Sequence, residues 1–241
     1  MSDRGARLNG ERVLKAAVKL ADREGIDSLT MRKLGEQLGA GPMSLYYHVA
    51  NKDALLDGMV DLVFGEIEVP SPAVDWKLAM RRRAISTREV LRRHPWALGR
   101  MEATKSPGPS DLRLHDAVLG CLRQAGFSVE MAVQAYSVQD AYIYGFALQE
   151  RTLAFGTRDE FVQTARKRVK EVETKVDDAA RLYPFLAEVV GGYIAKHGYD
   201  AAEAFEFGLD VILDGLEKLR TSAVPEPRAA TRAARSARRG G

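Results

Sequence analysis

The most constraining feature of the 241-residue sequence is a glycine-bearing break between two short amphipathic segments. Thr30 offers a hydroxyl N-cap to a first helix, and Gly39 stops that helix after about two turns. The break at residues 39–41 leads to Pro42, a residue suited to the first turn of a helix. Two short helices joined by a glycine-containing turn of about three residues make a helix-turn-helix.

The pattern around this motif predicts an all-α chain. An amphipathic helix over residues 11–24 precedes it, and a further helix over 51–67 ends before Pro70. Beyond this point the apolar spacing is helical throughout, with no persuasive alternating strand. The expected organisation is a three-helix domain that contains the helix-turn-helix, a connecting helix, a larger helical domain and a disordered arginine-rich tail: residues 1–52, 51–67, 68–222 and 223–241.

Two helices of the larger domain are apolar on more than one face. They cover residues 130–155 and 201–219. In the second helix, one face carries a stripe of apolar residues: Phe205, Leu209, Ile212 and Leu216. Three further apolar residues lie off this stripe: Phe207, Val211 and Leu213. Such helices need more than one neighbour, so we expect a homodimer through them.

Composition narrows the class of protein further. An apolar content of 46% supports a sizeable core, whereas no apolar run is long enough for a membrane span and the N-terminus lacks a secretory pattern. We therefore expect a cytoplasmic protein without a membrane partner. The single cysteine, Cys121, excludes an intrachain disulfide and a multi-cysteine zinc site, and we expect neither a cofactor nor a metal.

Positive charge is concentrated at the two ends of the chain. Residues 1–52 carry nine Lys/Arg against six Asp/Glu, and residues 223–241 carry five against one, whereas residues 53–222 carry 22 against 26. This distribution is expected if phosphate contacts are made at the ends.

The motif segment resembles the TetR family of regulators, in its tetracycline-repressor branch. The resemblance is carried by the sequences LTMRKLG at 29–35, SLYYHV at 44–49 and NKDALL at 51–56. It continues into the second domain through Asp75-Trp76, QAGFS at 124–128 and FGL at 207–209, and it covers residues from about 9 to 220. The family implies a homodimeric repressor that leaves a palindromic operator when a small-molecule effector binds. It also implies that residues 1–52 are the DNA-binding domain and residues 68–222 the ligand-binding and dimerisation domain.

The second helix of the motif is expected to enter the major groove of double-stranded operator DNA. Arg32 is the candidate for bidentate guanine readout, and Lys52 is expected to hold a phosphate at a helix N-terminus. The remaining predicted DNA contacts are Thr30, Pro42, Met43, Ser44, Tyr46, Tyr47 and His48. The tetracycline repressors begin this helix with a glutamine and a proline where Pro42 and Met43 stand, so a different operator is expected. A plainer interpretation places Arg32 on a solvated face and the two tyrosines in a core.

The resemblance also locates an effector site. Tetracycline repressors bind the drug as a magnesium chelate through a histidine, an asparagine and a glutamate, and Met101, Arg83 and Gln149 stand at those positions here. Because magnesium prefers oxygen ligands and arginine repels it, we expect an acidic effector held by Arg83 instead. The other predicted contacts are Thr87, Thr104 and Tyr142. The alternative is that Arg83 belongs to the solvated run Arg81–Arg83.

Two other functions are alternatives to that of a regulator. An enzyme built on His94, His115 and His197 is rejected, because no two of them share a spacing typical of a metal or catalytic pair. A nonspecific DNA-coating protein would rely on the arginines between 228 and 239 and would show no sequence preference.

Overall fold

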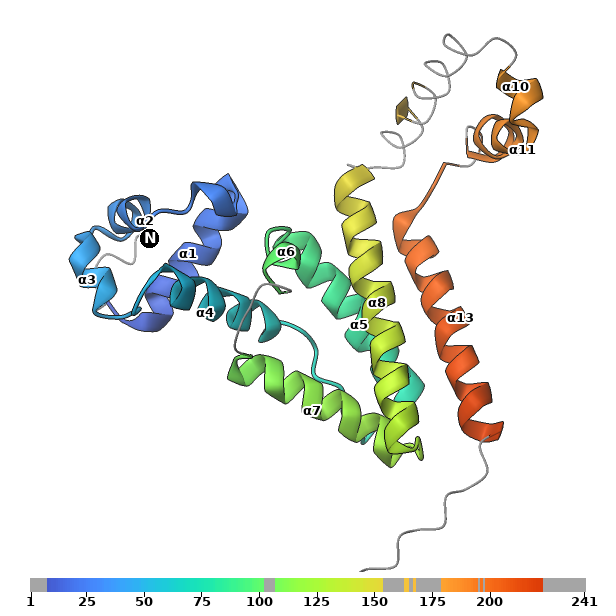
Figure 1. Ribbon diagram of the computed structural model, residues 1–241, viewed down its shortest axis with the longest axis horizontal. Coiled ribbons are helices and arrows are strands. Elements are labelled where there is room, and N and C mark those ends of the chain that lie inside the picture. Colours follow the sequence, from blue (N-terminus) through green and yellow to red (C-terminus); the bar gives the residue numbers. More distant parts are fainter. Residues whose placement is uncertain are drawn as a thin grey trace, which may run out of the picture.

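The computed structural model of the protein describes residues 8–101, 107–153, 179–194 and 198–222, together with residues 163, 164, 167 and 196. Every regular element within these residues is helical, as the sequence predicts (Figure 1). The N-terminal group consists of α1 (Gly10–Glu24), η1 (Ile26–Ser28), α2 (Met31–Leu38), α3 (Pro42–Tyr46) and α4 (Lys52–Phe64). The second group consists of α5 (Trp76–Arg93), α6 (Leu98–Met101), α7 (Pro109–Gln124), α8 (Val129–Leu153), α10 (Ala179–Leu182), α11 (Pro184–Ala187), the π-helical turn η2 (Glu188–Ile194) and α13 (Ala201–Ser222).

Helix α1 packs against both α2 and α4 and so connects the helices of the N-terminal group. The side chain of Asn9 caps its start by accepting from the Arg12 amide at 2.8 Å. Its apolar stripe is buried, and the anchors of the next two helices, Leu34 and Leu45, are fully buried in the same core. The helix-turn-helix is thus held by side chains that point away from its outer surface.

The turn between α2 and α3 depends on two glycines. Gly39 closes α2 in the left-handed conformation with φ 65°, which glycine adopts without a Cβ penalty. Gly35 lies one turn earlier, where its carbonyl accepts from the Ala40 amide at 2.9 Å. A Cβ on Gly35 would stand 2.6 Å from the Ala40 carbonyl oxygen, so the chain can fold back only with glycine there.

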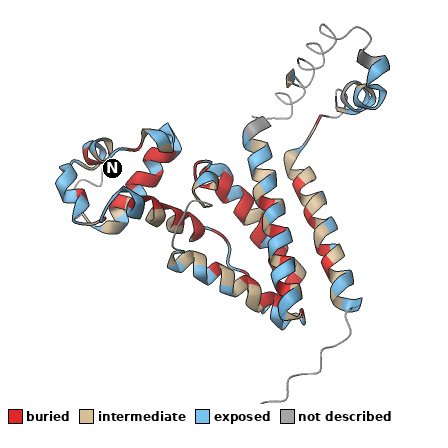
Figure 2. Ribbon diagram, viewed as in Figure 1, coloured by how far each residue is buried: buried red, intermediate tan, exposed pale blue. Residues whose placement is uncertain are grey.

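The second group is organised around α5. This helix packs against α7, α8 and α13, and Figure 2 shows buried residues (red) on all four helices. Trp76 at its start contacts Phe127 edge-on, and the Trp76 indole donates to Glu217 of α13 at 3.1 Å. Helix α4 packs against α7, and α7 packs against α5, so this packing also fixes where the N-terminal group sits.

Two details differ from the sequence prediction. The helix expected over 51–67 ends at Phe64, and Ile67 is buried in the connection that follows. Leu213, placed off the buried stripe of α13, is fully buried, whereas Ile212 is half-buried. Helix α13 packs against both α5 and α8, and its buried residues are Phe205, Leu209, Leu213 and Leu216, so Leu213 rather than Ile212 lies on the buried stripe.

Three predicted features lie outside the described residues: Thr104, His197 and the tail from residue 223. No helix in the part of the chain that the structure describes is long and apolar enough to cross a membrane.

Replacing Gly35 with alanine should destabilise the protein by about 1–3 kcal/mol, because the new methyl group meets backbone rather than a movable side chain. Gly120→Ala in α7 is the matched control, since nothing lies within 4 Å of its Cβ position. That variant should gain about 0.5–1 kcal/mol. Urea denaturation followed by circular dichroism measures both changes, and equal shifts in the two variants would refute the role given to the turn.

Candidate nucleic-acid interface and effector site

The start of α3 presents side chains that the protein core does not use. Pro42 occupies the first helical position, and Met43 and Tyr47 are 81% and 87% exposed. Tyr46 is 44% exposed, so neither tyrosine is a core aromatic and that alternative is wrong. Exposed apolar groups beside a helix N-terminus are suited to contact the bases and sugars of a groove.

Arg32 extends from α2 beside this surface. Its guanidinium pairs with Glu36 at 2.9 Å, and both side chains are largely exposed. An exposed pair of this kind contributes little stability, so Arg32 is free to exchange Glu36 for a base or phosphate at small cost. Neighbouring Lys33 instead reaches Glu24 at 3.0 Å.

Polar caps position the flanks of the surface. The Thr30 hydroxyl accepts from the Lys33 amide at 3.2 Å, which leaves its own proton available for donation. Asn51 caps α4 by accepting from the Ala54 amide at 2.8 Å, so that Lys52 stands exposed in the first turn. Ser44 is exposed and His48 half-buried, with its ring edge-on to Tyr47. The predicted DNA contacts therefore lie together along α2, α3 and the start of α4.

The proposed effector residue Arg83 is not part of a solvated run. It is 1% exposed, and its Nη2 donates to Asp140 of α8. Its Nε and Nη1 have no hydrogen-bond partner among the described residues. Because an unpartnered buried donor costs free energy, this guanidinium is suited to receive a polar group from a ligand.

Aromatic and acidic side chains of α8 contact Arg83. Its guanidinium lies 5.5 Å from the ring centre of Tyr136, and burial followed by the charge of Asp140 raises the pKa of the Tyr136 hydroxyl. Burial likewise raises the pKa of Tyr144 well above its usual range. Both phenols are therefore neutral and able to donate hydrogen bonds at physiological pH.

The other predicted effector residues differ from Arg83 in their burial and hydrogen bonding. The buried Thr87 hydroxyl donates to the Arg83 carbonyl at 2.8 Å, and the Tyr142 hydroxyl donates to the Phe205 carbonyl at 2.9 Å. Met101 is half-buried at the end of α6, and Gln149 is exposed on α8. Thr104 lies outside the described residues.

Sequence reasoning missed the carboxylates that face the buried arginines. Asp140 pairs with Arg83. Glu150 accepts two hydrogen bonds from Arg88, one from Nε at 2.8 Å and one from Nη2 at 2.6 Å. The available signal was that these two carboxylates are the only charged residues in the otherwise uncharged stretch 135–150. An isolated acid in such a stretch needs a buried cationic partner. The described residues contain no group of three or more side chains able to hold a metal ion.

A capped helix-turn-helix with an exposed first turn, joined to a helical domain with a buried polar site, defines a DNA-binding regulator. The chain matches two family models, described as "Bacterial regulatory proteins, tetR family" over residues 13–59 and "Tetracyclin repressor-like, C-terminal domain" over residues 69–220. The chain belongs to the TetR family, and it is a ligand-responsive DNA-binding transcriptional regulator rather than an enzyme.

Characterised relatives agree with this assignment. The chain is 36% identical over 216 residues to the HTH-type transcriptional repressor DrrR1 of Streptomyces coeruleorubidus. This match covers 87% of this chain and 77% of the relative. It is 35% identical over 217 residues to the tetracycline repressor protein class A from transposon 1721 of Escherichia coli, covering 89% and 93%. The fold matches that of ActR from Streptomyces coelicolor in complex with actinorhodin, with a TM-score of 0.71, 28% identity and coverage of 89% and 99%.

Proposed function

We propose that this protein is a cytoplasmic repressor whose homodimer reads a palindromic operator with α3 and releases it when an acidic small molecule binds at Arg83. The observation that carries the DNA-binding part is the exposure of Met43 and Tyr47 beside a weakly held Arg32. These groups are costly to expose without a partner, and they are arranged on one continuous surface.

On this surface each residue has a chemical role. The first turn of α3 enters the major groove, where Pro42 and Met43 contact thymine methyl groups and Ser44 reaches a base edge. Arg32 reads guanine through two parallel hydrogen bonds after leaving Glu36.

Phosphate contacts fix the register of the domain on the duplex. Lys52 binds phosphate together with the N-terminal amides of α4, and Thr30, Tyr46, Tyr47 and His48 are placed to contact the backbone or neighbouring bases. We take residues 1–52 as the DNA-binding domain, with α4 as its connection to the rest of the chain.

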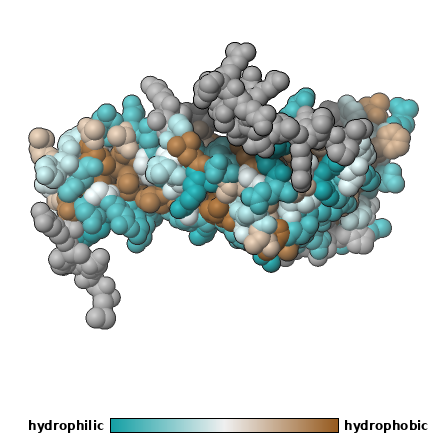
Figure 3. All heavy atoms as spheres, turned by 90° about the horizontal axis from the view of Figure 1, so that it is seen from below, coloured by the Kyte–Doolittle hydropathy of each residue, from teal (hydrophilic) through white to brown (hydrophobic). Residues whose placement is uncertain are grey.

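The dimer contact is proposed along α8 and α13. Phe207 and Val211 of α13 are 74% and 58% exposed, and Val138 and Leu148 are exposed on α8. Both helices carry exposed residues, pale blue in Figure 2, beside their buried ones. In the view of Figure 3 the apolar residues gather mainly over the N-terminal group and the middle of the molecule, so the proposed contact rests on the exposure of the α8 and α13 residues themselves. A second copy that covers this face would space two α3 helices for half-sites about one DNA turn, roughly 34 Å, apart.

The effector part rests on the incomplete hydrogen bonding of Arg83. Asp140 occupies only one of its three nitrogens, so an acidic group can be bound by the other two. Tyr136 and Tyr144 add neutral donors and aromatic surface on the same helix as Asp140. We place Thr87, Met101, Thr104, Tyr142 and Gln149 around the rest of the ligand.

Selection of bound sequences from a pool of random duplexes tests DNA reading. The wild-type protein should enrich a palindromic motif. Arg32→Ala should lose the preference at one base position in each half-site, at a cost of about 1–3 kcal/mol, and Tyr47→Ala should weaken binding without loss of stability because the side chain is exposed.

Arg23→Ala is the matched control, since this exposed arginine lies outside the predicted contacts and should leave the motif unchanged. Binding without a motif, unaffected by these substitutions and abolished by deletion of residues 223–241, would favour the DNA-coating alternative.

Release of the selected duplex tests the effector class. Aromatic carboxylic acids should reduce its fluorescence anisotropy, whereas their methyl esters should not, because the ester lacks the charge that Arg83 binds. The double variant Arg83→Met with Asp140→Leu should bind the duplex and ignore the acids, since apolar replacement of a buried pair preserves folding. Release by esters and acids alike would contradict the assignment, as would release by minocycline with magnesium.

Phe207→Glu should convert the dimer to a monomer at micromolar concentration, because it buries an unpaired charge in the proposed contact. Leu112→Glu on α7 is the matched control, since Leu112 is 56% exposed and lies outside that contact. Light scattering after size exclusion measures the mass. A Phe207→Glu protein that stays dimeric would place the subunit contact elsewhere.

A further inference from the structure

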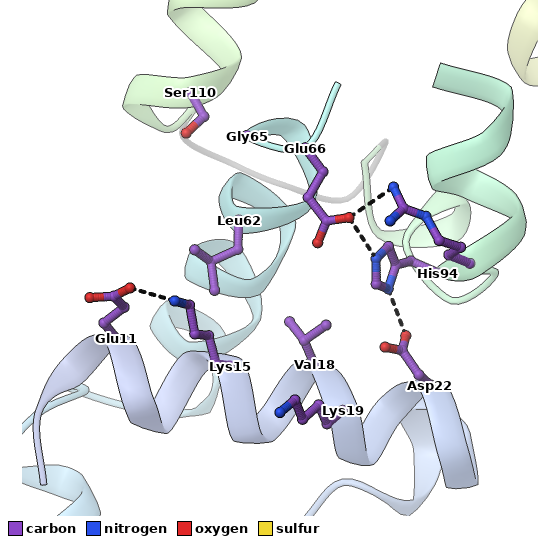
Figure 4. A pocket seen from close by; sticks show the side chains of 11 residues that line it. Glu11, Lys15, Val18, Lys19, Asp22, Leu62, Gly65, Glu66, His94 and Ser110 are labelled. Atoms are coloured by element: carbon purple, nitrogen blue, oxygen red, sulfur yellow. Dashed lines mark hydrogen bonds and ion pairs between the residues drawn. The ribbon is translucent and has the colours of Figure 1, made fainter. Parts of the chain in front are cut away.

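A buried histidine joins the two domains. His94 directly follows α5, is 7% exposed, and places Nδ1 2.8 Å from Asp22 Oδ1 and Nε2 3.3 Å from Glu66 Oε2 (Figure 4). Asp22 belongs to α1 and Glu66 follows α4, so both carboxylates come from the group that carries the helix-turn-helix. The ring therefore bridges the effector-site helix and the DNA-binding domain.

The hydrogen-bond partners specify the protonation state that suits this geometry. Asp22 Oδ1 also accepts from the Trp96 indole at 2.7 Å, and Glu66 Oε2 also accepts from Arg93 at 3.0 Å. Both carboxylates thus act as acceptors, and each ring nitrogen of His94 must donate. Only the imidazolium has two N–H groups, whereas either neutral tautomer turns a lone pair toward a carboxylate.

The charged neighbours of the ring come from three elements. The carboxylates of Asp22 and Glu66 face His94, and the guanidinium of Arg93 pairs with Glu66. The cluster lines a cleft of about 640 Å³ between α1, the end of α4 and the start of α7, which gives the ring access to protons from solvent. The remaining charged groups of that cleft are Glu11, Lys15 and Lys19 of α1, of which Glu11 and Lys15 pair with each other at 2.6 Å.

The position of His94 along the chain links it to the effector site. Arg83 and Thr87 lie on the same helix, two to three turns earlier, and Met101 ends α6 just after it. On the other side, α1 packs directly against α2 and α4, which frame the DNA-reading surface. Any shift of the end of α5 relative to α1 must stretch the contacts of His94.

We propose that His94 is a proton-operated latch between the effector domain and the DNA-binding domain. As an imidazolium it holds α5 to Asp22 and Glu66, and loss of one proton releases one of the two contacts. Because an ordinary histidine changes charge between about pH 5 and pH 8, the latch makes the coupling between the two domains sensitive to physiological pH. The fluorescence test below is independent of the proposed function, whereas the DNA test rests on it.

Tryptophan fluorescence reports the latch directly. The chain has two tryptophans, and Trp76→Phe leaves only Trp96, whose ring centre lies 6.3 Å from that of His94. Since an imidazolium quenches indole emission, the emission should fall as pH is lowered from about 8 to about 5. The additional substitution His94→Gln should abolish this transition, and His115→Gln, a histidine on α7, should leave it unchanged.

Asp22→Asn provides a test that keeps His94 in place. Removal of this carboxylate charge should move the midpoint of the transition to lower pH, because the imidazolium loses a charged partner. Glu66→Gln should move it in the same direction. A transition independent of His94, or midpoints unmoved in both carboxylate variants, would overturn the proposal even if His94→Gln failed to fold.

The selected operator duplex tests the coupling to DNA. Between about pH 6 and pH 8 the full-length wild-type affinity should change by about fivefold or more, and His94→Gln should lose most of that change. His48→Gln is the necessary control, because His48 lies in the DNA surface and contributes its own titration. Equal pH dependence in the wild type and His94→Gln would show that the latch is not coupled to operator binding. If no operator is selected, the proposed function fails while the fluorescence result still decides the latch.

Discussion

The burial of two arginines on α5 is the constraint around which the larger domain is arranged. Arg83 and Arg88 are 1% and 7% exposed, and a buried guanidinium without a carboxylate is strongly destabilising. Asp140 and Glu150 of α8 meet this need, which sets both the register and the rotation of α8 against α5. Phe146 and Phe205 flank Arg88, so α13 is drawn into the same arrangement.

This arrangement connects the candidate effector site to the DNA-binding surface through one rigid element. Arg83 lies in the middle of α5, and the helix ends at His94 against α1 and the segment after α4. A ligand that alters how Arg83 shares Asp140 acts on a helix whose far end contacts the DNA-binding domain. For an effector bound at Arg83, as proposed above, the path to the DNA-binding domain runs along this one helix to His94.

The chain combines a weakly held outer surface with strongly held inner contacts. On the DNA side, Arg32 and Glu36 form an exposed pair that is readily exchanged for phosphate or base contacts. Inside the larger domain, the pairs Arg83–Asp140 and Arg88–Glu150 are buried. In the proposed function, reading of DNA and sensing of a small molecule use the same side-chain chemistry at different degrees of burial.

The sequence by itself determined the helix-turn-helix, because its signals are local. Thr30, Gly39 and Pro42 act within one or two turns of their own positions, and the motif around Tyr46 and Tyr47 was sufficient to indicate the family. The position of the turn follows from the same short-range pattern, whereas only the structure decided that both tyrosines are exposed.

Tertiary structure decided what depends on residues far apart in the chain. Arg83 meets Asp140 across 57 positions and His94 meets Asp22 across 72, so neither pairing leaves a periodic trace in the sequence. The burial of Leu213 likewise required knowing that α13 lies between two helices. A local pattern specifies how a segment folds, whereas the partner of a buried charge is specified only when distant segments pack together.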